Sequence, residues 1–187
     1  MLITIFANIF LVLFLFTEIF LRKKGESSSL KADKSDNGTT RIIFFTYISS
    51  IAFLLVLSFV DIGFFENAII GWIGLFIMAF GLILRFLSMR ELGKYYSRTL
   101  RTAEDQKLIT TGPYRLIRHP GYLSSISIWV GTGLALQNFV MIPVFFLLFV
   151  GVYIYRITSE EKMLTAEFGE NYIKYQSKSW RLLPYIY

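Results

Sequence analysis

Residues that could carry out chemistry gather in two short segments of the chain. The first is GPYRLIRHPGYL, residues 112–123, which holds the one histidine of the chain, His119, with two arginines, two prolines and two tyrosines. The second is YRITSEEKML, residues 155–164, in which Arg156 and Glu160 are four positions apart. On a helix, that spacing places both side chains on one face. The two segments are therefore candidate sites of binding or catalysis.

Each segment also has a plain structural explanation. Residues 112–123 could form an interfacial turn with tyrosine anchors, and an exposed i,i+4 ion pair contributes only about 0.2–0.5 kcal/mol. However, Arg before Glu is the less favourable order for such a pair, and ionisable groups beside an apolar span are functional candidates. Gly112-Pro113 and Pro120-Gly121 bracket the first segment and fix its backbone more tightly than an anchor requires. We therefore interpret both segments as functional.

The composition is that of an integral membrane protein. Mean hydropathy is +0.55, and 17% of residues are charged, against about 25% in soluble proteins. The net charge of +6 could indicate a nucleic-acid partner, but the basic residues flank apolar runs and no base-reading motif is present. A chain with no cysteine and one histidine predicts no metal site. Its chemistry must come from carboxylates, arginines, tyrosines or an organic cofactor.

Long apolar runs predict about five membrane-spanning helices. Three of them are near the roughly 20 residues that cross the hydrocarbon core, and the first lacks the flanking features of a signal peptide. A fourth run is too long for one crossing and has a polar break at Gln137 and Asn138, which predicts a helical hairpin. We therefore expect an all-α polytopic membrane bundle. The predicted spans lie at residues 2–21, 42–60 and 68–87, with the hairpin at 122–157.

The whole chain, residues 1–187, is predicted to form a single integral-membrane domain. Residues 1–87 supply the three N-terminal spans, and residues 106–187 carry the two candidate segments. The third span has three glycines that would let a neighbouring helix approach closely. The tail has three aromatic residues at i, i+4 and i+7, which predicts one face of a helix lying along the membrane interface. These are Gly71, Gly74 and Gly81 in the span, and Phe168, Tyr172 and Tyr175 in the tail.

Lysine and arginine in the short loops predict the orientation. Basic residues are concentrated in residues 22–41, 88–121 and 158–187, which we expect on the cytoplasmic side. The acidic loop 61–67 and the polar turn at 137–138 are then expected outside, together with the N-terminus. Both candidate segments lie on the cytoplasmic side in this topology, where they can meet.

The two segments together resemble a known family. GPYRLIRHPGY, a helical hairpin, R-x-x-x-E-E-x-x-L-x-x-x-F-G-x-x-Y-x-x-Y and a closing R-x-x-P are similar to the isoprenylcysteine carboxyl methyltransferase family and to its relatives, the membrane phospholipid methyltransferases. The resemblance covers about Gln106 to Pro184. It implies S-adenosylmethionine as cofactor, S-adenosylhomocysteine as product, and a prenylated or lipid-like acceptor. A G-x-G-x-x-G fingerprint is absent, so we expect no Rossmann-like site.

The resemblance also implies roles for particular residues. Arg156 matches the family's substrate-side arginine, and Arg156 and Glu160 would form the catalytic pair. His119 would contact the cofactor and would not act as a base. The cofactor contacts implied by the resemblance are Gln106, Lys107, Leu108, Ile109, Tyr114, His119, Pro120, Gly121, Tyr122 and Glu160.

The acceptor is open at this point. A carboxylate acceptor is already ionised at neutral pH and needs no base, and a guanidinium such as Arg156 can orient it. A phospholipid amine must lose a proton, for which Glu160 or Glu161 would serve. Membrane sterol reductases that use NADPH carry a similar R-H-P-x-Y turn, but typically as R-H-P-N-Y with Gly-Glu soon after, whereas this chain has RHPGYLSS. A non-catalytic scaffold or transporter would place polar residues in mid-span. The sequence favours carboxyl methylation.

Overall fold

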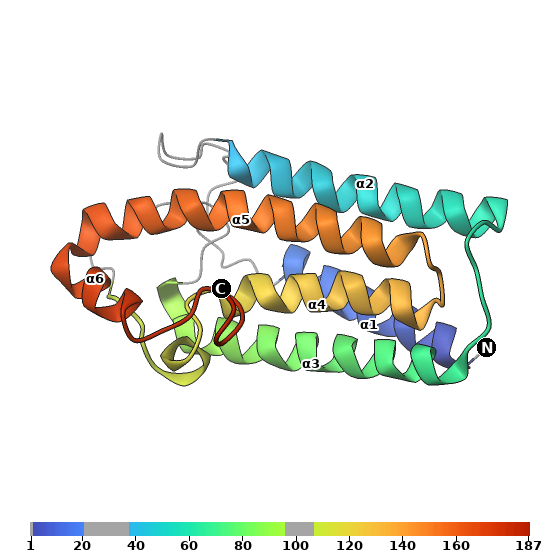
Figure 1. The fold of residues 1–187 in the computed structure, drawn as a ribbon, viewed down its shortest axis with the longest axis horizontal. Coiled ribbons are helices and arrows are strands. Elements are labelled where there is room, and N and C mark those ends of the chain that lie inside the picture. The colour runs from blue at the N-terminus through green and yellow to red at the C-terminus, as the bar shows by residue number, and fades with distance from the viewer. Residues whose placement is uncertain (1, 21–37, 96–106) are drawn as a thin grey trace.

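The computed structural model describes residues 2–20, 38–95 and 107–187, and within these ranges its regular elements are helices (Figure 1). The expected all-α fold is confirmed for this part of the chain. The helices are α1 (Leu2–Phe20), α2 (Thr39–Val60), α3 (Ala68–Leu92), α4 (Pro120–Ala135), α5 (Met141–Phe168) and α6 (Glu170–Gln176), with 3-10 turns η2 (Gly93–Tyr95) and η3 (Gly112–Arg115).

Helix α4 lies at the centre of the bundle. It packs along α3 on one side and α5 on the other, α1 contacts both α3 and α4, and α2 runs beside α5 (Figure 1). Trp129 of α4 is fully buried and stacks on Phe149 of α5, with ring centroids 5.0 Å apart. Burial of these large aromatic side chains fixes the hairpin against the rest of the core.

The predicted glycine contacts of α3 are confirmed. A Cβ atom on Gly74 would lie 2.3 Å from the backbone nitrogen of Ala135, and one on Gly81 would lie 2.9 Å from the carbonyl oxygen of Ser124. One on Gly71 would meet side-chain atoms of Ile3 at 3.0 Å. Helices α3 and α4 therefore touch backbone to backbone, which is possible only with small residues at the contact.

The predicted hairpin turn is also confirmed. Helix α4 ends at Ala135 and α5 begins at Met141, with the polar turn between them. The Asn138 side chain accepts hydrogen bonds from the backbone N–H groups of Val140 and Met141, each at 3.0 Å, and donates one to the carbonyl of Ile62 at 2.8 Å. The buried Asn138 amide therefore satisfies backbone N–H groups at the start of α5, and it also holds the loop between α2 and α3 against the turn.

Three helices in the described part of the chain, α2, α3 and α5, are long and apolar enough to cross a membrane. Each of the five predicted spans corresponds to one helix, but the apolar part of α1 is shorter than these three, and α4 has 16 residues. Most side chains of α4 are buried among the other helices, so this helix lies inside the bundle, away from lipid.

The predicted aromatic face of the tail is wrong as a single helical face. Gly169 has φ +51° and ends α5 at Phe168, and a separate helix, α6, begins at Glu170. The positive φ at this glycine turns the chain. As a result, Tyr172 is buried under the end of α5 instead of continuing the face that Phe168 begins. The tail does begin as an extension of the last span, as predicted.

We predict that Gly74→Ala lowers the stability of the bundle. The added methyl group would collide with the backbone of α4, and overpacking of this kind costs about 1–3 kcal/mol or more. The midpoint of thermal unfolding in detergent measures the effect. Gly151→Ala is the matched control, because a Cβ atom there meets no atom within 4 Å. Equal midpoints for the two variants would contradict the close contact of α3 with α4.

Candidate active site

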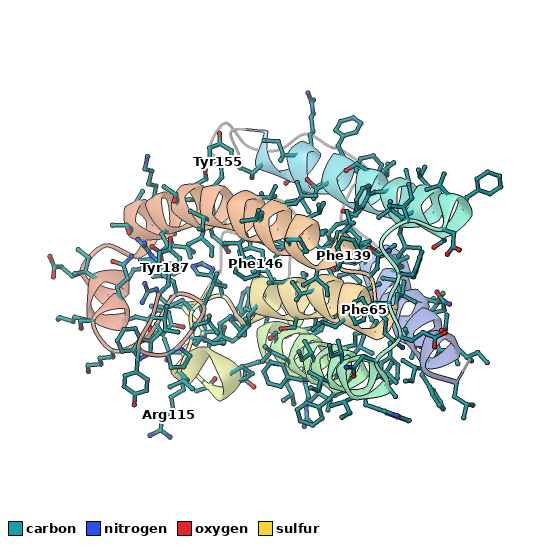
Figure 2. All side chains as sticks on the ribbon, turned by 45° about the vertical axis from the view of Figure 1, so that its right-hand side comes forward. Phe65, Arg115, Phe139, Phe146, Tyr155 and Tyr187 are labelled. Atoms are coloured by element: carbon teal, nitrogen blue, oxygen red, sulfur yellow. The ribbon has the colours of Figure 1, made fainter. Side chains whose placement is uncertain are left out.

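The two candidate segments lie at the same end of the bundle. Residues 107–119 fold beneath the C-terminal end of α5, next to α6 (Figure 1). Arg115 and Tyr187 mark this end in Figure 2, whereas Phe65 and Phe139 lie toward the opposite one. We call the end that carries α6 the site end. Segments separated by the whole hairpin in sequence are therefore neighbours in space, as the sequence predicts.

The Tyr122 hydroxyl joins the two predicted catalytic residues. Arg156 Nε donates a hydrogen bond to this hydroxyl at 3.1 Å, and the hydroxyl donates to Glu160 Oε2 at 2.6 Å. The expectation that Arg156 and Glu160 face the same way on α5 is thus confirmed. The structure places Tyr122, from the first turn of α4, between a buried cation and a carboxylate.

His119 lies between two carboxylates. Its Nδ1 is 3.5 Å from Glu160 Oε2 and its Nε2 is 3.3 Å from Glu161 Oε1. Burial lowers the pKa of the imidazole, but hydrogen bonds to Glu160 and Glu161 outweigh this effect, and the net pKa lies above its usual value. Protonated imidazole can donate to both carboxylates at once. Both ring nitrogens of His119 thus face glutamates.

Glu160 and Glu161 are adjacent in sequence but differ in their surroundings. The Glu161 side chain is 6% exposed and accepts hydrogen bonds from Arg118 Nε and Arg181 Nε, each at 2.9 Å. The Glu160 side chain is 24% exposed and contacts Tyr122 and His119. The Glu161 carboxylate is paired with two guanidinium groups, whereas the Glu160 carboxylate is more accessible to a ligand.

A stack of aromatic rings leads from the site into the bundle. His119 stacks on Tyr122, with centroids 5.5 Å apart, and Tyr122 stacks on Tyr153 at 4.8 Å. The Tyr153 hydroxyl lies 2.8 Å from the hydroxyl of Tyr47, which in turn donates to Ser125 Oγ at 3.3 Å. Helices α2, α4 and α5 are therefore connected by polar contacts just below the site.

Helix α2 supplies site contacts that the sequence analysis missed. Arg156 is 2% exposed, and its Nη1 donates to the hydroxyls of Thr39 and Thr40 in the first turn of α2, to Thr40 at 3.1 Å. A guanidinium buried at a membrane protein's end requires such acceptors. The Thr-Thr pair at the start of an apolar run was the available signal, but its meeting with Arg156 is a tertiary contact that spacing does not reveal.

A buried ion pair was also missed. Glu18 of α1 contacts Arg85 of α3, with both side chains under a tenth exposed, and Arg85 Nη1 donates to the carbonyl of Gly121 at 3.3 Å. The signal was available, because an ionisable residue inside an apolar run is a functional or structural candidate. This pair fixes the first turn of α4, and therefore Tyr122, to α1 and α3.

The structure brings together only part of the predicted site. Tyr122 contacts His119, Arg156 and Glu160, and His119 also contacts Glu160. Pro120 and Gly121 lie in the same turn. Tyr114 is buried, and its backbone carbonyl accepts a hydrogen bond from the Tyr175 hydroxyl at 2.6 Å. Lys107 is exposed, Leu108 and Ile109 are half-buried, and Gln106 lies outside the described residues.

Comparisons with known proteins found similar chains. Residues 72–166, just over half of the chain, match the model of the isoprenylcysteine carboxyl methyltransferase (ICMT) family. A probable protein-S-isoprenylcysteine O-methyltransferase of Oryza sativa subsp. indica is 38% identical over 124 residues, and the enzyme of Schizosaccharomyces pombe is 32% identical over 111 residues. These matches cover 65% and 58% of this chain.

A solved structure is similar as well. It is that of the eukaryotic intramembrane Ras methyltransferase ICMT, with a TM-score of 0.64 and 26% sequence identity, and the match covers 77% of this chain and 52% of that one. The chain spans 64% of the length of the rice relative and 47% of that of the fission yeast relative. The likeness is therefore to part of each larger protein. Residues 72–166, which match the family model, contain both candidate segments.

Proposed function

Because the chain belongs to the isoprenylcysteine carboxyl methyltransferase family, we propose that it is an integral-membrane methyltransferase that uses S-adenosylmethionine to esterify the α-carboxylate of a C-terminal isoprenylcysteine. One observation carries the proposal. The Tyr122 hydroxyl joins the buried guanidinium of Arg156, which suits an anionic acceptor, to the accessible carboxylate of Glu160, which suits a cationic cofactor. A carboxylate and a sulfonium are the two reactants of such a transfer.

The chemistry of the residues at the site end fits this cofactor. S-Adenosylmethionine, when bound, supplies a methyl group on a positively charged sulfur. Glu160 can accept hydrogen bonds from its ammonium or ribose groups. We propose that Glu160, Tyr122, Pro120 and Gly121 hold it, with His119 keeping Glu160 in place. The other proposed cofactor contacts are Gln106, Lys107, Leu108, Ile109 and Tyr114.

Arg156 holds the acceptor in this proposal. A planar guanidinium can donate two parallel hydrogen bonds to a carboxylate. In this structure its Nε and Nη1 donate to the hydroxyls of Tyr122, Thr39 and Thr40, so the acceptor carboxylate would displace some of these hydroxyls when it binds. An α-carboxylate has a pKa of about 3.3–3.7 and is ionised at neutral pH, so no base is needed. The residues then have to hold the reacting atoms about 3–3.5 Å apart and exclude water.

The environment of Glu161 favours this acceptor over a lipid amine. Methylation of phosphatidylethanolamine, the second candidate function, requires a group that takes up a proton. Glu161 is buried against Arg118, Arg181 and His119, which stabilise its charged form and leave it a poor proton acceptor. Glu160 is the remaining carboxylate, and in the proposal it faces the cofactor.

The orientation in the membrane is part of the proposal. Basic residues of the loops and tail favour a cytoplasmic site end, with five helices crossing or entering the bilayer and the whole chain acting as one domain. A prenyl chain is too apolar to approach through water, so the acceptor would enter from the lipid between helices. Helix α2, which carries Thr39 and Thr40, borders that approach to Arg156.

We predict that changes at Glu160 and Arg156 have different effects. Glu160→Gln should weaken S-adenosylhomocysteine binding roughly 10- to 150-fold, because a charged hydrogen bond contributes about 1.5–3 kcal/mol. Arg156→Lys should leave that affinity nearly unchanged while methylation falls steeply, because an ammonium lacks the planar fork. Calorimetry and turnover assays measure the two quantities, with exposed Glu167→Gln as the control. The reverse pattern would show that the two roles are exchanged.

We predict that the purified protein methylates a farnesylated cysteine analogue. The acceptor assay measures transfer of a labelled methyl group from S-adenosylmethionine, with phosphatidylethanolamine as the alternative acceptor. Arg156 supplies the reason, because it can hold a carboxylate and repels a lipid ammonium. If only the amine lipid were labelled, carboxyl methylation would be excluded and the second candidate function would hold.

A further inference from the structure

The last residues of the chain are bonded to the loop that precedes α4. Trp180 N–H donates to the carbonyl of Leu116 at 3.0 Å, Arg118 N–H donates to Trp180 at 2.7 Å, and His119 N–H donates to the carbonyl of Arg181 at 3.1 Å. These bonds form a short parallel bridge between Ile117 and Trp180. The tail is thus joined through its backbone to the turn that carries His119.

Side chains strengthen the same junction. Arg118 Nη1 donates to the carbonyl of Gln176 at 3.1 Å and to the carbonyl of Ser179. Arg118 itself is under a tenth exposed, so these bonds lie inside the protein. We call residues 176–181 the C-terminal clamp. They surround the guanidinium of Arg118 and keep its Nε directed at Glu161.

Glu161 is the point at which α5, the loop and the clamp meet. Its Oε1 accepts from Arg118 Nε at 2.9 Å and lies 3.3 Å from His119 Nε2, and its Oε2 accepts from Arg181 Nε at 2.9 Å. Two guanidinium groups and the imidazole therefore all face this one buried carboxylate. Loss of Arg181 would leave Oε2 without this donor, and the carboxylate could turn away from His119.

The position of His119 determines that of the proposed cofactor residues. Its ring stacks on Tyr122 and its Nδ1 faces Glu160, so a shift of the ring changes both. Arg181 is 39% exposed in its side chain, which makes it the member of the cluster most accessible to change without disturbing the core. The matched part of the family model ends at residue 166, before the clamp begins.

We propose that Glu161 and Arg181 are positioning residues, and that the C-terminal clamp holds His119, and through it Glu160 and Tyr122, in the arrangement that binds the cofactor. Neither residue touches the cofactor or the acceptor. The inference rests on the proposed function, because it assigns the cofactor to Glu160 and Tyr122. In this proposal, the tail of the chain positions the cofactor-binding residues without contacting the cofactor itself.

The test compares Arg181→Gln, Arg181→Lys and the control Lys174→Gln, which removes the same charge from an exposed position in the tail outside the clamp. Calorimetry with S-adenosylhomocysteine gives the Kd, and the methylation assay gives KM for the farnesylated cysteine analogue. We expect Arg181→Gln to raise the Kd about tenfold and to leave the acceptor KM within about twofold. Arg181→Lys should recover part of the affinity, because an ammonium can still reach Glu161.

Three outcomes would overturn the inference. Arg181→Gln could bind S-adenosylhomocysteine like Lys174→Gln, or it could raise the Kd and the acceptor KM by the same factor, as a general loss of structure would. If Arg181→Gln does not fold, Arg181→Lys provides the test. A Kd of Arg181→Lys equal to that of the wild type would show that cofactor binding does not depend on the planar guanidinium or on the clamp geometry. These results leave the proposed function intact, because that function fails if the wild-type protein binds no S-adenosylhomocysteine or methylates the amine lipid alone.

Discussion

The site depends on one constraint, which is that the buried guanidinium of Arg156 needs hydrogen-bond acceptors. The side chain is 2% exposed, and three hydroxyls, those of Tyr122, Thr39 and Thr40, accept from it. They come from α4 and α2, so the guanidinium of Arg156 on α5 links three helices at one end of the bundle. The Glu18 and Arg85 pair completes the arrangement, because Arg85 fixes the carbonyl of Gly121 next to Tyr122.

Environment separates the roles of two neighbouring carboxylates in the proposed mechanism. Glu160 and Glu161 are one residue apart on α5, yet Glu161 is enclosed by two guanidinium groups and Glu160 is partly exposed beside Tyr122. His119 contacts both carboxylates, so a shift of Glu161 would also shift Glu160 through the imidazole. The chain therefore has one glutamate to support the site and one that a ligand can reach.

Much of the fold and part of the site could be predicted from the sequence, for identifiable physical reasons. Apolar length and the polar break at Asn138 gave the hairpin, Gly74 predicted the close helix contact, and helical spacing placed Arg156 and Glu160 on one face. The contact of Thr39 with Arg156 joins residues far apart in the chain, which periodicity does not encode. The tail was misjudged because a helical pattern of aromatic residues continued past Gly169, where a positive φ ends the helix.

The most direct test of this account is the effect of Tyr122→Phe on both ligands. The change keeps the ring that stacks on Tyr153 and removes only the hydroxyl that joins Arg156 to Glu160. The Kd for S-adenosylhomocysteine, measured by calorimetry, and the KM for the acceptor should each rise roughly 2- to 13-fold, since a hydrogen bond contributes a net of about 0.5–1.5 kcal/mol. Wild-type values for both ligands would contradict the claim that this hydroxyl couples the two halves of the site.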